Sequence, residues 1–216
     1  MSDLADLADV ADLADVADVA ALDAAETKGE RTRRRILEIA IDRFGRRGYR
    51  ATSVSEIARA AGLTQAASYA YFDSKEALFR AAVDEDASAM IDEISVRTAD
   101  LPATDLIPSL IIYAVMVLGE HPLAHRVLAG QEPDEVPRLV ELPALRRFGD
   151  MIGDHLAAAQ QRGEIRRDFD AHVLSSGIEA LVLGLLFSTI QTGGVAAERH
   201  QIGVVEAFDL MIRPTS

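Results

Sequence analysis

The sequence contains no cysteine and no tryptophan, and aromatic residues make up only 5% of its 216 positions. Without cysteine, the chain can form neither disulfides nor thiolate metal sites, which fits a reducing compartment. It also lacks a run of about 18 unbroken apolar residues and a basic start followed by an apolar segment. We therefore expect a soluble, cytoplasmic protein that does not enter a membrane. Because 49% of the residues are hydrophobic, a sizeable core can form.

Basic residues are absent from the first 27 positions, which hold eight acids. Residues 3–20 repeat an Asp–(Leu/Val)–Ala triplet six times. A period of 3 differs from the 3.6 residues of a helical turn, so the apolar positions spiral around a helix and form no single face. We expect residues 1–27 to be a disordered acidic arm. The alternative is that the arm mimics phosphates and competes for a basic part of the same chain.

Charge is distributed unevenly along the chain. The formal net charge is −13, but residues 28–80 hold twelve Lys or Arg against six acids, a local net charge of +6. Residues 81–216 are acidic, with ten bases and twenty-one acids. A basic segment inside an acidic chain is the footprint expected of an anion-binding module.

This basic segment carries the signals of short helices. Apolar residues recur at helical spacing before Gly48, namely Ile36, Leu37, Ala40, Ile41 and Phe44. Ser53, with Glu56 three residues later, predicts a helix start by a capping box. Gly62 suits the left-handed end of that helix, and Thr64 can cap the next one. Residues 53–72 therefore have helix-turn-helix spacing.

A fourth helix is expected to begin at Asp73 or Ser74 and to run towards Ile94. Beyond residue 101, strand signals are absent, and we expect helices separated by Pro102, Pro122, Pro137, Pro143, Gly163 and Gly193–Gly194. Residues 175–194 are apolar on nearly all sides, and residues 196–213 form a last amphipathic helix. Two such helices can supply a dimer seam. The expected fold class is all-α.

The stretch "TRRRILEIAIDRFGRRGYRATSVSEIARAAGLTQAASYAYFDSKEALF", residues 32–79, resembles the DNA-binding domain of the tetracycline-repressor (TetR) family of transcriptional regulators. The matching features are Ile36–Leu37, Ala40, Phe44, Gly48–Tyr49, Thr52–Ser53, Ile57–Ala58, Ala61–Gly62, Tyr69, Tyr71–Phe72 and Lys75. The resemblance implies a three-helix DNA-binding head, residues 28–80, followed by a larger helical bundle, residues 81–216, for effector binding and dimerisation. It also implies a homodimer on a palindromic double-stranded DNA operator, acting most often as a repressor released by a small molecule.

A recognition helix places its N-terminal residues against base edges in the major groove. Gln65 carries an amide that can bridge adenine N6 and N7, and Ala66 and Ala67 can contact thymine methyl groups. Hydroxyl and ammonium groups that can reach phosphates lie on Ser53, Ser55, Thr64, Tyr69, Tyr71 and Lys75. Tyr69 could instead be a core aromatic residue, and Phe72 is expected to pack inward. The chain departs from the family pattern at Ala66, Ala67, Ser68 and Ala70, so no operator sequence is predicted.

For the effector, we expect a mainly apolar pocket and a hydrophobic or amphipathic ligand. The candidate lining residues are Met90, Tyr113, Met116, Phe148, Met151, His155 and Phe187. One hydrogen bond could come from Tyr113 or His155. The alternative is that most of these residues are plain core. Glu179 lies in an apolar helix and is expected either to face a cavity or to pair across a dimer.

No cofactor or metal is expected. His121 and His125 have a spacing that suits one helix face, but Pro122 stands between them and no third ligand lies near in sequence. We find no nucleophile–base pair, phosphate-binding glycine loop or metal cluster, so an enzyme is not expected. Two other classes stay open, a regulator without a small-molecule effector and an activator of transcription.

Overall fold

The computed structural model describes residues 27–132, 134, 141–192 and 197–213, with side chains of the last helix described from residue 202. Within these residues there is no strand, and the predicted all-α class is confirmed. The helices are α2 (Lys28–Ala51), α3 (Val54–Ala60), α4 (Gln65–Ser68), α5 (Lys75–Thr98), α6 (Ala103–Val117), the 3₁₀ turn η1 (Leu118–Glu120), α7 (Pro122–Leu128), α8 (Pro143–Arg162), α9 (Ala171–Gln191) and α10 (Ala197–Ile212). The acidic arm and the breaks predicted at Pro137 and Gly193–Gly194 lie outside the described residues.

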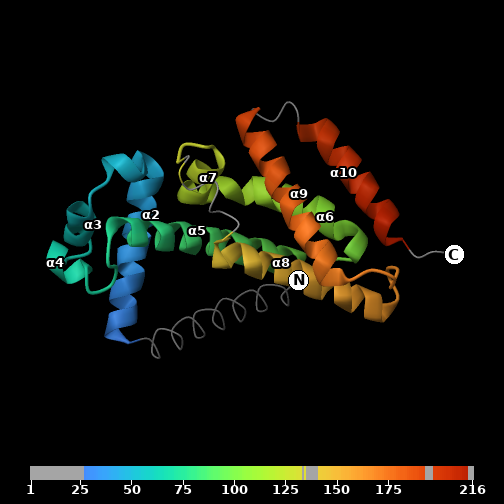
Figure 1. Ribbon diagram of the computed structural model, residues 1–216, viewed down its shortest axis with the longest axis horizontal. Coiled ribbons are helices and arrows are strands. Elements are labelled where there is room, and N and C mark those ends of the chain that lie inside the picture. Colours follow the sequence, from blue (N-terminus) through green and yellow to red (C-terminus); the bar gives the residue numbers. More distant parts are fainter. Residues whose placement is uncertain (1–26, 133, 135–140, 193–196, 214–216) are drawn as a thin grey trace, which may run out of the picture.

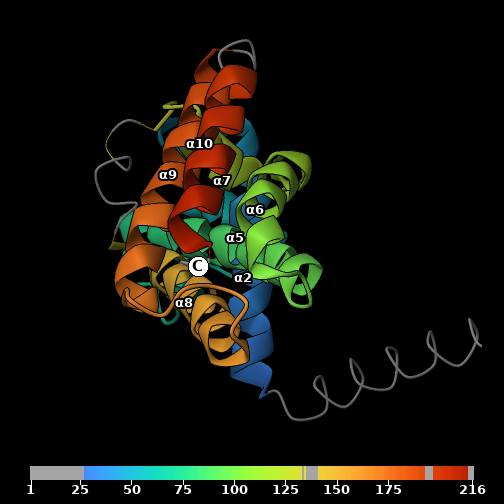
Figure 2. The same cartoon turned by 90° about the vertical axis from the view of Figure 1, so that its right-hand side faces the viewer.

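The helices form two groups joined by α5. Figure 1 shows α2, α3 and α4 gathered at one end, while α5 runs from this end along the length of the molecule. There α5 packs against α2, α6, α7 and α8. Figure 2, which looks along the molecule from the opposite end, shows α10 in front, with α9 and α6 on either side of it. A shift of α5 therefore affects both groups of helices.

Local capping explains where the first helices begin. The hydroxyl oxygens of Ser53, Thr64 and Ser74 each accept a hydrogen bond from the backbone amide three residues later, at 3.2, 3.1 and 3.0 Å. These bonds confirm the three predicted helix starts. The full capping box, however, is formed by Thr27 and Glu30 at the start of α2.

Glycine and proline mark the other boundaries. Gly62 and Gly163 both have φ of 76° and end α3 and α8 in the left-handed region, as predicted for Gly62. Pro122 and Pro143 are the first residues of α7 and α8. The first helical run breaks at Gly48, as predicted, because its φ of 81° and ψ of 169° are not helical; beyond this kink α2 continues to Ala51.

Two helical segments are apolar and long enough to cross a membrane by length and composition alone. Residues 103–120 and α9 have mean hydropathies of 1.5 and 1.9, with 44% and 28% of these segments buried. Acidic residues interrupt both segments, Asp105 and Glu120 in the first and Glu179 in α9, so neither is an unbroken apolar run. Both pack within the bundle, α6 against α5 and α9 against α8. The low buried share of α9 leaves an apolar face of this helix uncovered.

Candidate DNA interface and ligand cavity

The start of α4 presents small polar and apolar residues to solvent. Thr64, Gln65 and Ala66 are exposed, whereas Ser68 is only 2% exposed. The Ser68 hydroxyl donates a hydrogen bond to the Gln65 carbonyl at 2.7 Å, which satisfies this polar group at a core position. Phe72 is buried, as predicted. Buried Ser68 and Phe72 thus anchor α4 on the core, and the exposed residues at its start can approach another molecule closely.

Two tyrosines follow this turn in different environments. Tyr69 is 42% exposed, so it is not simply a core aromatic residue. Its hydroxyl accepts a long hydrogen bond of 3.5 Å from the Gln65 side-chain amide. At that length the bond is weak, and the Gln65 amide can be redirected to a base edge. Tyr71 is half-buried and packs against the core.

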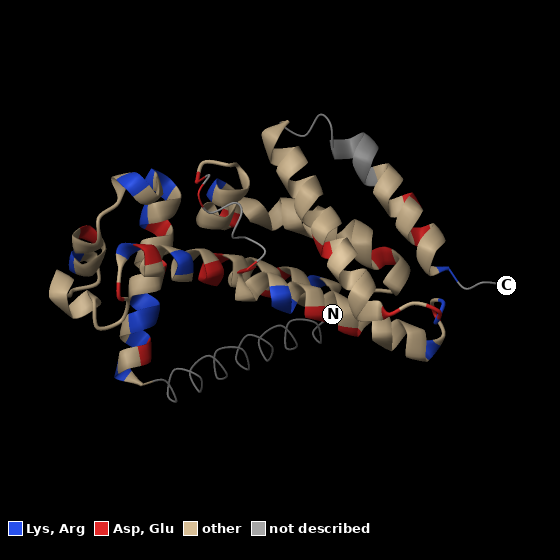
Figure 3. Cartoon of the chain, viewed as in Figure 1, with Lys and Arg blue, Asp and Glu red and all other residues tan. Residues whose placement is uncertain are grey.

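Cations surround the same end of the molecule (Figure 3). The Lys75 ammonium lies 4.4 Å from the centre of the Tyr49 ring, and the Arg33 guanidinium lies 5.0 Å from the centre of the Phe72 ring. Such cation–π contacts favour one position of a long basic side chain. Sequence reasoning did not single out Tyr49 or Arg33 as partners of these groups.

The nine residues predicted to contact DNA lie on α3 and α4, at the residues that cap them, in the turn after α4 and at the start of α5, at one end of the molecule (Figure 1). They are Ser53, Ser55, Thr64, Gln65, Ala66, Ala67, Tyr69, Tyr71 and Lys75. Ser53 and Ser55 have their hydroxyl oxygens 3.0 Å apart. The arrangement offers a short turn for base edges with hydroxyl and ammonium groups on its flanks.

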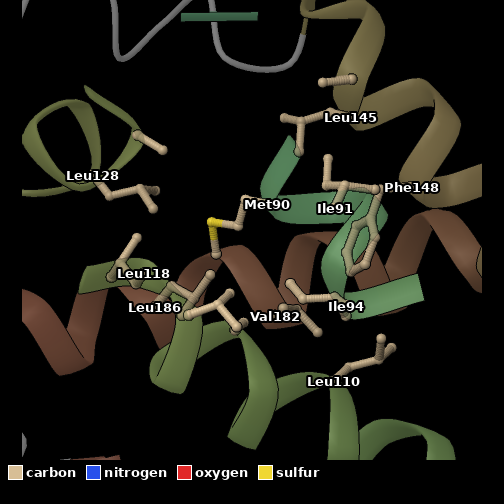
Figure 4. Close-up of a cluster of buried hydrophobic side chains, with 14 of the residues drawn as sticks. Met90, Ile91, Ile94, Leu110, Leu118, Leu128, Leu145, Phe148, Val182 and Leu186 are labelled. Carbon is tan, nitrogen blue, oxygen red and sulfur yellow. The ribbon is translucent and has the colours of Figure 1, made fainter. Parts of the chain in front are cut away.

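A cavity of about 60 Å³ lies inside the second group of helices. Every residue that lines it is apolar, and the lining comes from α5, α6, α7, α8, α9 and Leu142. Figure 4 shows part of this region, where Met90, Leu128 and Leu186 approach one another from three helices. One water molecule needs about 10–15 Å³ of such space, so the cavity has room for a small apolar group.

Of the seven residues predicted to line a pocket, Met90 and Phe148 line this cavity and the other five do not. Met116 is 64% exposed. Tyr113 is half-buried, with the Arg97 guanidinium 5.8 Å from its ring centre. His155 is half-buried, and burial lowers the pKa of its ring. The remaining two, Met151 and Phe187, pack against the core.

The lining residues that sequence reasoning missed are all aliphatic, from Ala114 and Val182 to Leu186. Helical spacing could mark these positions as buried. Helical spacing does not indicate which of the buried residues leave a cavity between them.

A buried polar cluster fixes α7 to α5. Asp86 is 4% exposed, and its Oδ2 accepts hydrogen bonds from the backbone amides of Leu123 and Ala124 at 2.9 and 2.8 Å. Its Oδ1 lies 3.2 Å from His121 Nδ1. On the other side of the ring, His121 Nε2 lies 3.7 Å from Glu93 Oε2. The hydrogen bond with Asp86 is the largest cause that raises the pKa of His121, and Glu93 adds to it.

This cluster shows whether His121 and His125 lie on one helix face with a common partner. His121 is turned towards Asp86, while His125 is exposed one turn later. The pair therefore does not share one partner, and His121 links two helices.

The sequence is similar to those of known bacterial regulators. Residues 36–82 match the sequence model of bacterial regulatory proteins of the tetR family. The HTH-type transcriptional repressor KstR2 of Rhodococcus jostii is 31% identical over 160 residues, covering 69% of this chain and 76% of that protein.

Solved structures agree with the fold. A TetR-family transcriptional regulator from Mesorhizobium loti superposes with a TM-score of 0.66 at 25% identity, covering 88% of this chain and all of that one. FadR of Bacillus subtilis, solved in complex with stearoyl-CoA, has a TM-score of 0.58 at 18% identity over 82% of this chain and 95% of that one. The chain belongs to the tetR family of bacterial regulatory proteins and is a helix-turn-helix, DNA-binding regulator of transcription.

Proposed function

We propose that this protein is a homodimeric repressor that binds a palindromic operator and is released by a hydrophobic or amphipathic small molecule. The observation that carries the proposal is that α5 joins an exposed, cation-flanked α4 turn to a bundle holding an apolar cavity. The repressor role is supported by the likeness to KstR2. In this proposal residues 28–80 bind DNA, and residues 81–216 bind the effector and dimerise.

DNA binding rests on the α4 turn. Gln65 reads a base edge in the major groove, and Ala66 and Ala67 allow close approach. The hydroxyl groups of Ser53, Ser55, Thr64, Tyr69 and Tyr71 and the ammonium group of Lys75 bind phosphates. Two such heads must enter successive major grooves about 34–36 Å apart, so a change in their separation lowers operator affinity.

Dimerisation uses the uncovered faces of α9 and α10. Val173 and Leu181 of α9 are 73% and 44% exposed. Gly177 and Gly184 lie on the same helix, and among the described residues no atom lies within 4 Å of a Cβ placed at either glycine. On α10, Leu210 and Met211 are 66% and 44% exposed, and Ile202, which lines a groove against α6, is 63% exposed. Small and apolar residues on two neighbouring helices suit close packing against a second copy of the same pair. Covering this face also agrees with a soluble, cytoplasmic protein.

The effector places its apolar part in the cavity. Since the described residues that line the cavity are all apolar, a polar end of the ligand is expected to lie outside it. That FadR binds stearoyl-CoA supports a ligand of this kind. A ligand larger than about 60 Å³ must separate helices that line the cavity, including α5 and α7. It releases DNA to the extent that it binds this separated state more tightly than the DNA-bound state.

The test is operator binding in the presence of a free long-chain fatty acid and its coenzyme A thioester. Operator affinity should fall with the probe that fits. In Ala114→Leu, which places extra carbon in the cavity, operator affinity and stability should survive while the effect of the probe is lost.

If Ala114→Leu instead lowers stability by about 1–3 kcal/mol without any probe, the site is close-packed core. Together with unchanged operator binding by both probes, that result would favour a regulator without a small-molecule effector. An activator would be recognised by lower expression of its target on deletion of the gene.

A further inference from the structure

A kink at Gly48 exposes one backbone amide of α2 to another part of the chain. The φ of 81° and ψ of 169° at Gly48 interrupt the helix just before Tyr49. The Tyr49 amide then donates a hydrogen bond to Oε1 of Glu132 at 3.0 Å, across 83 residues of sequence. The backbone of the DNA-binding head is thus bonded to the segment that follows α7.

The Glu132 carboxylate also binds α7. Its Oε1 accepts a hydrogen bond of 2.7 Å from Nε of Arg126. The Glu132 side chain is only 12% exposed and that of Arg126 is 22% exposed, so water screens this ion pair weakly. We call the Tyr49 amide, Glu132 and Arg126 the Glu132 bridge. A Cβ at Gly48 would stand 2.4 Å from Arg126 Nη2, so the bridge needs glycine at the kink.

The Tyr49 side chain links the Glu132 bridge to Lys75. Its ring packs against Phe44 and Phe79, at centroid distances of 6.2 and 5.1 Å. The Lys75 ammonium lies 4.4 Å from the centre of the same ring. The position of Tyr49 therefore sets where the Lys75 ammonium rests.

On the other side, the bridge reaches the cavity. Arg126 belongs to α7, whose Ala124, Val127 and Leu128 line the cavity. Arg126 lies on α7 and Glu132 lies shortly after the end of this helix, so a displacement of α7 would move the Glu132 carboxylate relative to the Tyr49 amide.

We propose that Glu132 is a positioning residue for DNA binding, which fixes Tyr49 and through its ring holds Lys75 in place for a phosphate. The inference rests on the proposed phosphate contact of Lys75. It adds a specific coupling that does not follow from that contact, namely that Lys75 acts fully only while Glu132 holds Tyr49.

A double-mutant cycle tests this coupling with the full-length protein. The variants are Lys75→Ala, Glu132→Ala and the double variant, and the probe is a duplex selected by the wild-type protein from a random pool. Affinity is measured between about 50 and 200 mM salt. The matched control is Asp134→Ala, which removes an exposed acid from the same polar cleft between the head and α7.

Glu132→Ala should weaken binding about tenfold and lower the slope of log affinity against log salt by up to about one unit, as Lys75→Ala does. In the Lys75→Ala background, Glu132→Ala should have little further effect. Asp134→Ala should give the same small factor in both backgrounds. Circular dichroism checks that each variant is folded.

Equal losses from Glu132→Ala with and without Lys75 would overturn the proposal while leaving DNA binding intact. If the wild-type protein selects and binds no DNA, the proposed function itself fails. Should Glu132→Ala not fold, Glu132→Gln carries the same cycle. It keeps an acceptor for the Tyr49 amide but loses the charge facing Arg126, so we expect a smaller loss that again vanishes without Lys75, and an additive loss would overturn the proposal.

Discussion

Gly45 of α2 lies directly against Pro122, the first residue of α7. A Cβ at Gly45 would stand 2.8 Å from Pro122 Cβ, closer than packed carbon atoms approach. The missing side chain therefore lets α7 sit on the first helix of the DNA-binding head. Since α7 also lines the cavity, this contact joins the helices around the cavity directly to the head.

Gly45→Ala should push α7 away from α2. Inside a helix, alanine ordinarily stabilises by about 0.5–1 kcal/mol relative to glycine. Here we expect the clash to prevail and to destabilise the protein by about 1–3 kcal/mol, with weaker operator binding. Urea denaturation and DNA titration measure both effects. Gly119→Ala, where no atom lies within 4 Å of the added Cβ, should not destabilise, and equal behaviour of the two variants would argue against the contact.

The cluster of Asp86, His121 and Glu93 predicts a pH dependence of stability. The pKa of His121 is raised above 6.5 in the folded protein, first by the hydrogen bond with Asp86. The folded state therefore binds this proton more tightly than the unfolded state does. The stabilisation is fully present below about pH 6.5 and is lost as the pH rises through the folded-state pKa.

The measurement is the difference in unfolding free energy between the wild type and His121→Asn, whose amide still donates to Asp86 but does not titrate. This difference should shrink as the pH rises above 6.5. A difference that stays constant or grows with pH would show that His121 is neutral in the folded protein.

Glu179 of α9 is a group whose charged form destabilises the folded protein, in contrast to His121. Burial raises the pKa of this carboxyl, and Asp150 raises it further. Its charged form is therefore unfavourable in the folded chain. Glu179→Gln should raise the melting temperature at neutral pH, and the gain should disappear below about pH 4.5, where the carboxyl is protonated in both states. A lower melting temperature at neutral pH would instead support pairing of Glu179 across the proposed dimer.

Leu181 tests the proposed dimer face. An exposed leucine replaced by aspartate changes monomer stability little, but a carboxylate buried between two copies is unfavourable. Leu181→Asp should shift the protein from dimer to monomer in analytical ultracentrifugation and weaken binding to a palindromic duplex. Glu206→Gln, an exposed change on α10, is the comparison. A fully dimeric Leu181→Asp protein would move the interface elsewhere.

Helix starts at Ser53, Thr64 and Ser74 could be predicted because a cap is a contact between residues three positions apart. The left-handed end at Gly62 is equally local. The Tyr49–Glu132 bond spans 83 residues, so no local pattern encodes it. The fold and the starts of these helices could therefore be predicted from the sequence, while the contacts between the head and the bundle could not.

The residues that line the cavity also could not be predicted from local sequence patterns. Met116 was a candidate lining residue because its side chain is flexible and apolar, yet it is exposed on α6. Ala114, two residues earlier, lines the cavity with a side chain too small to fill it. A gap forms where small residues from several helices meet, and that depends on packing between segments distant in sequence.

The central claim is that the α4 turn reads DNA through Gln65. The most direct measurement is selection of duplexes from a random pool by the wild-type protein and by Gln65→Ala, followed by titration of the selected sequences. The account predicts an inverted repeat for the wild type, and for Gln65→Ala a loss of about 1–3 kcal/mol that is confined to one base position in each half-site. No enriched sequence for the wild type, or an equal loss by Gln65→Ala on every duplex, would contradict it.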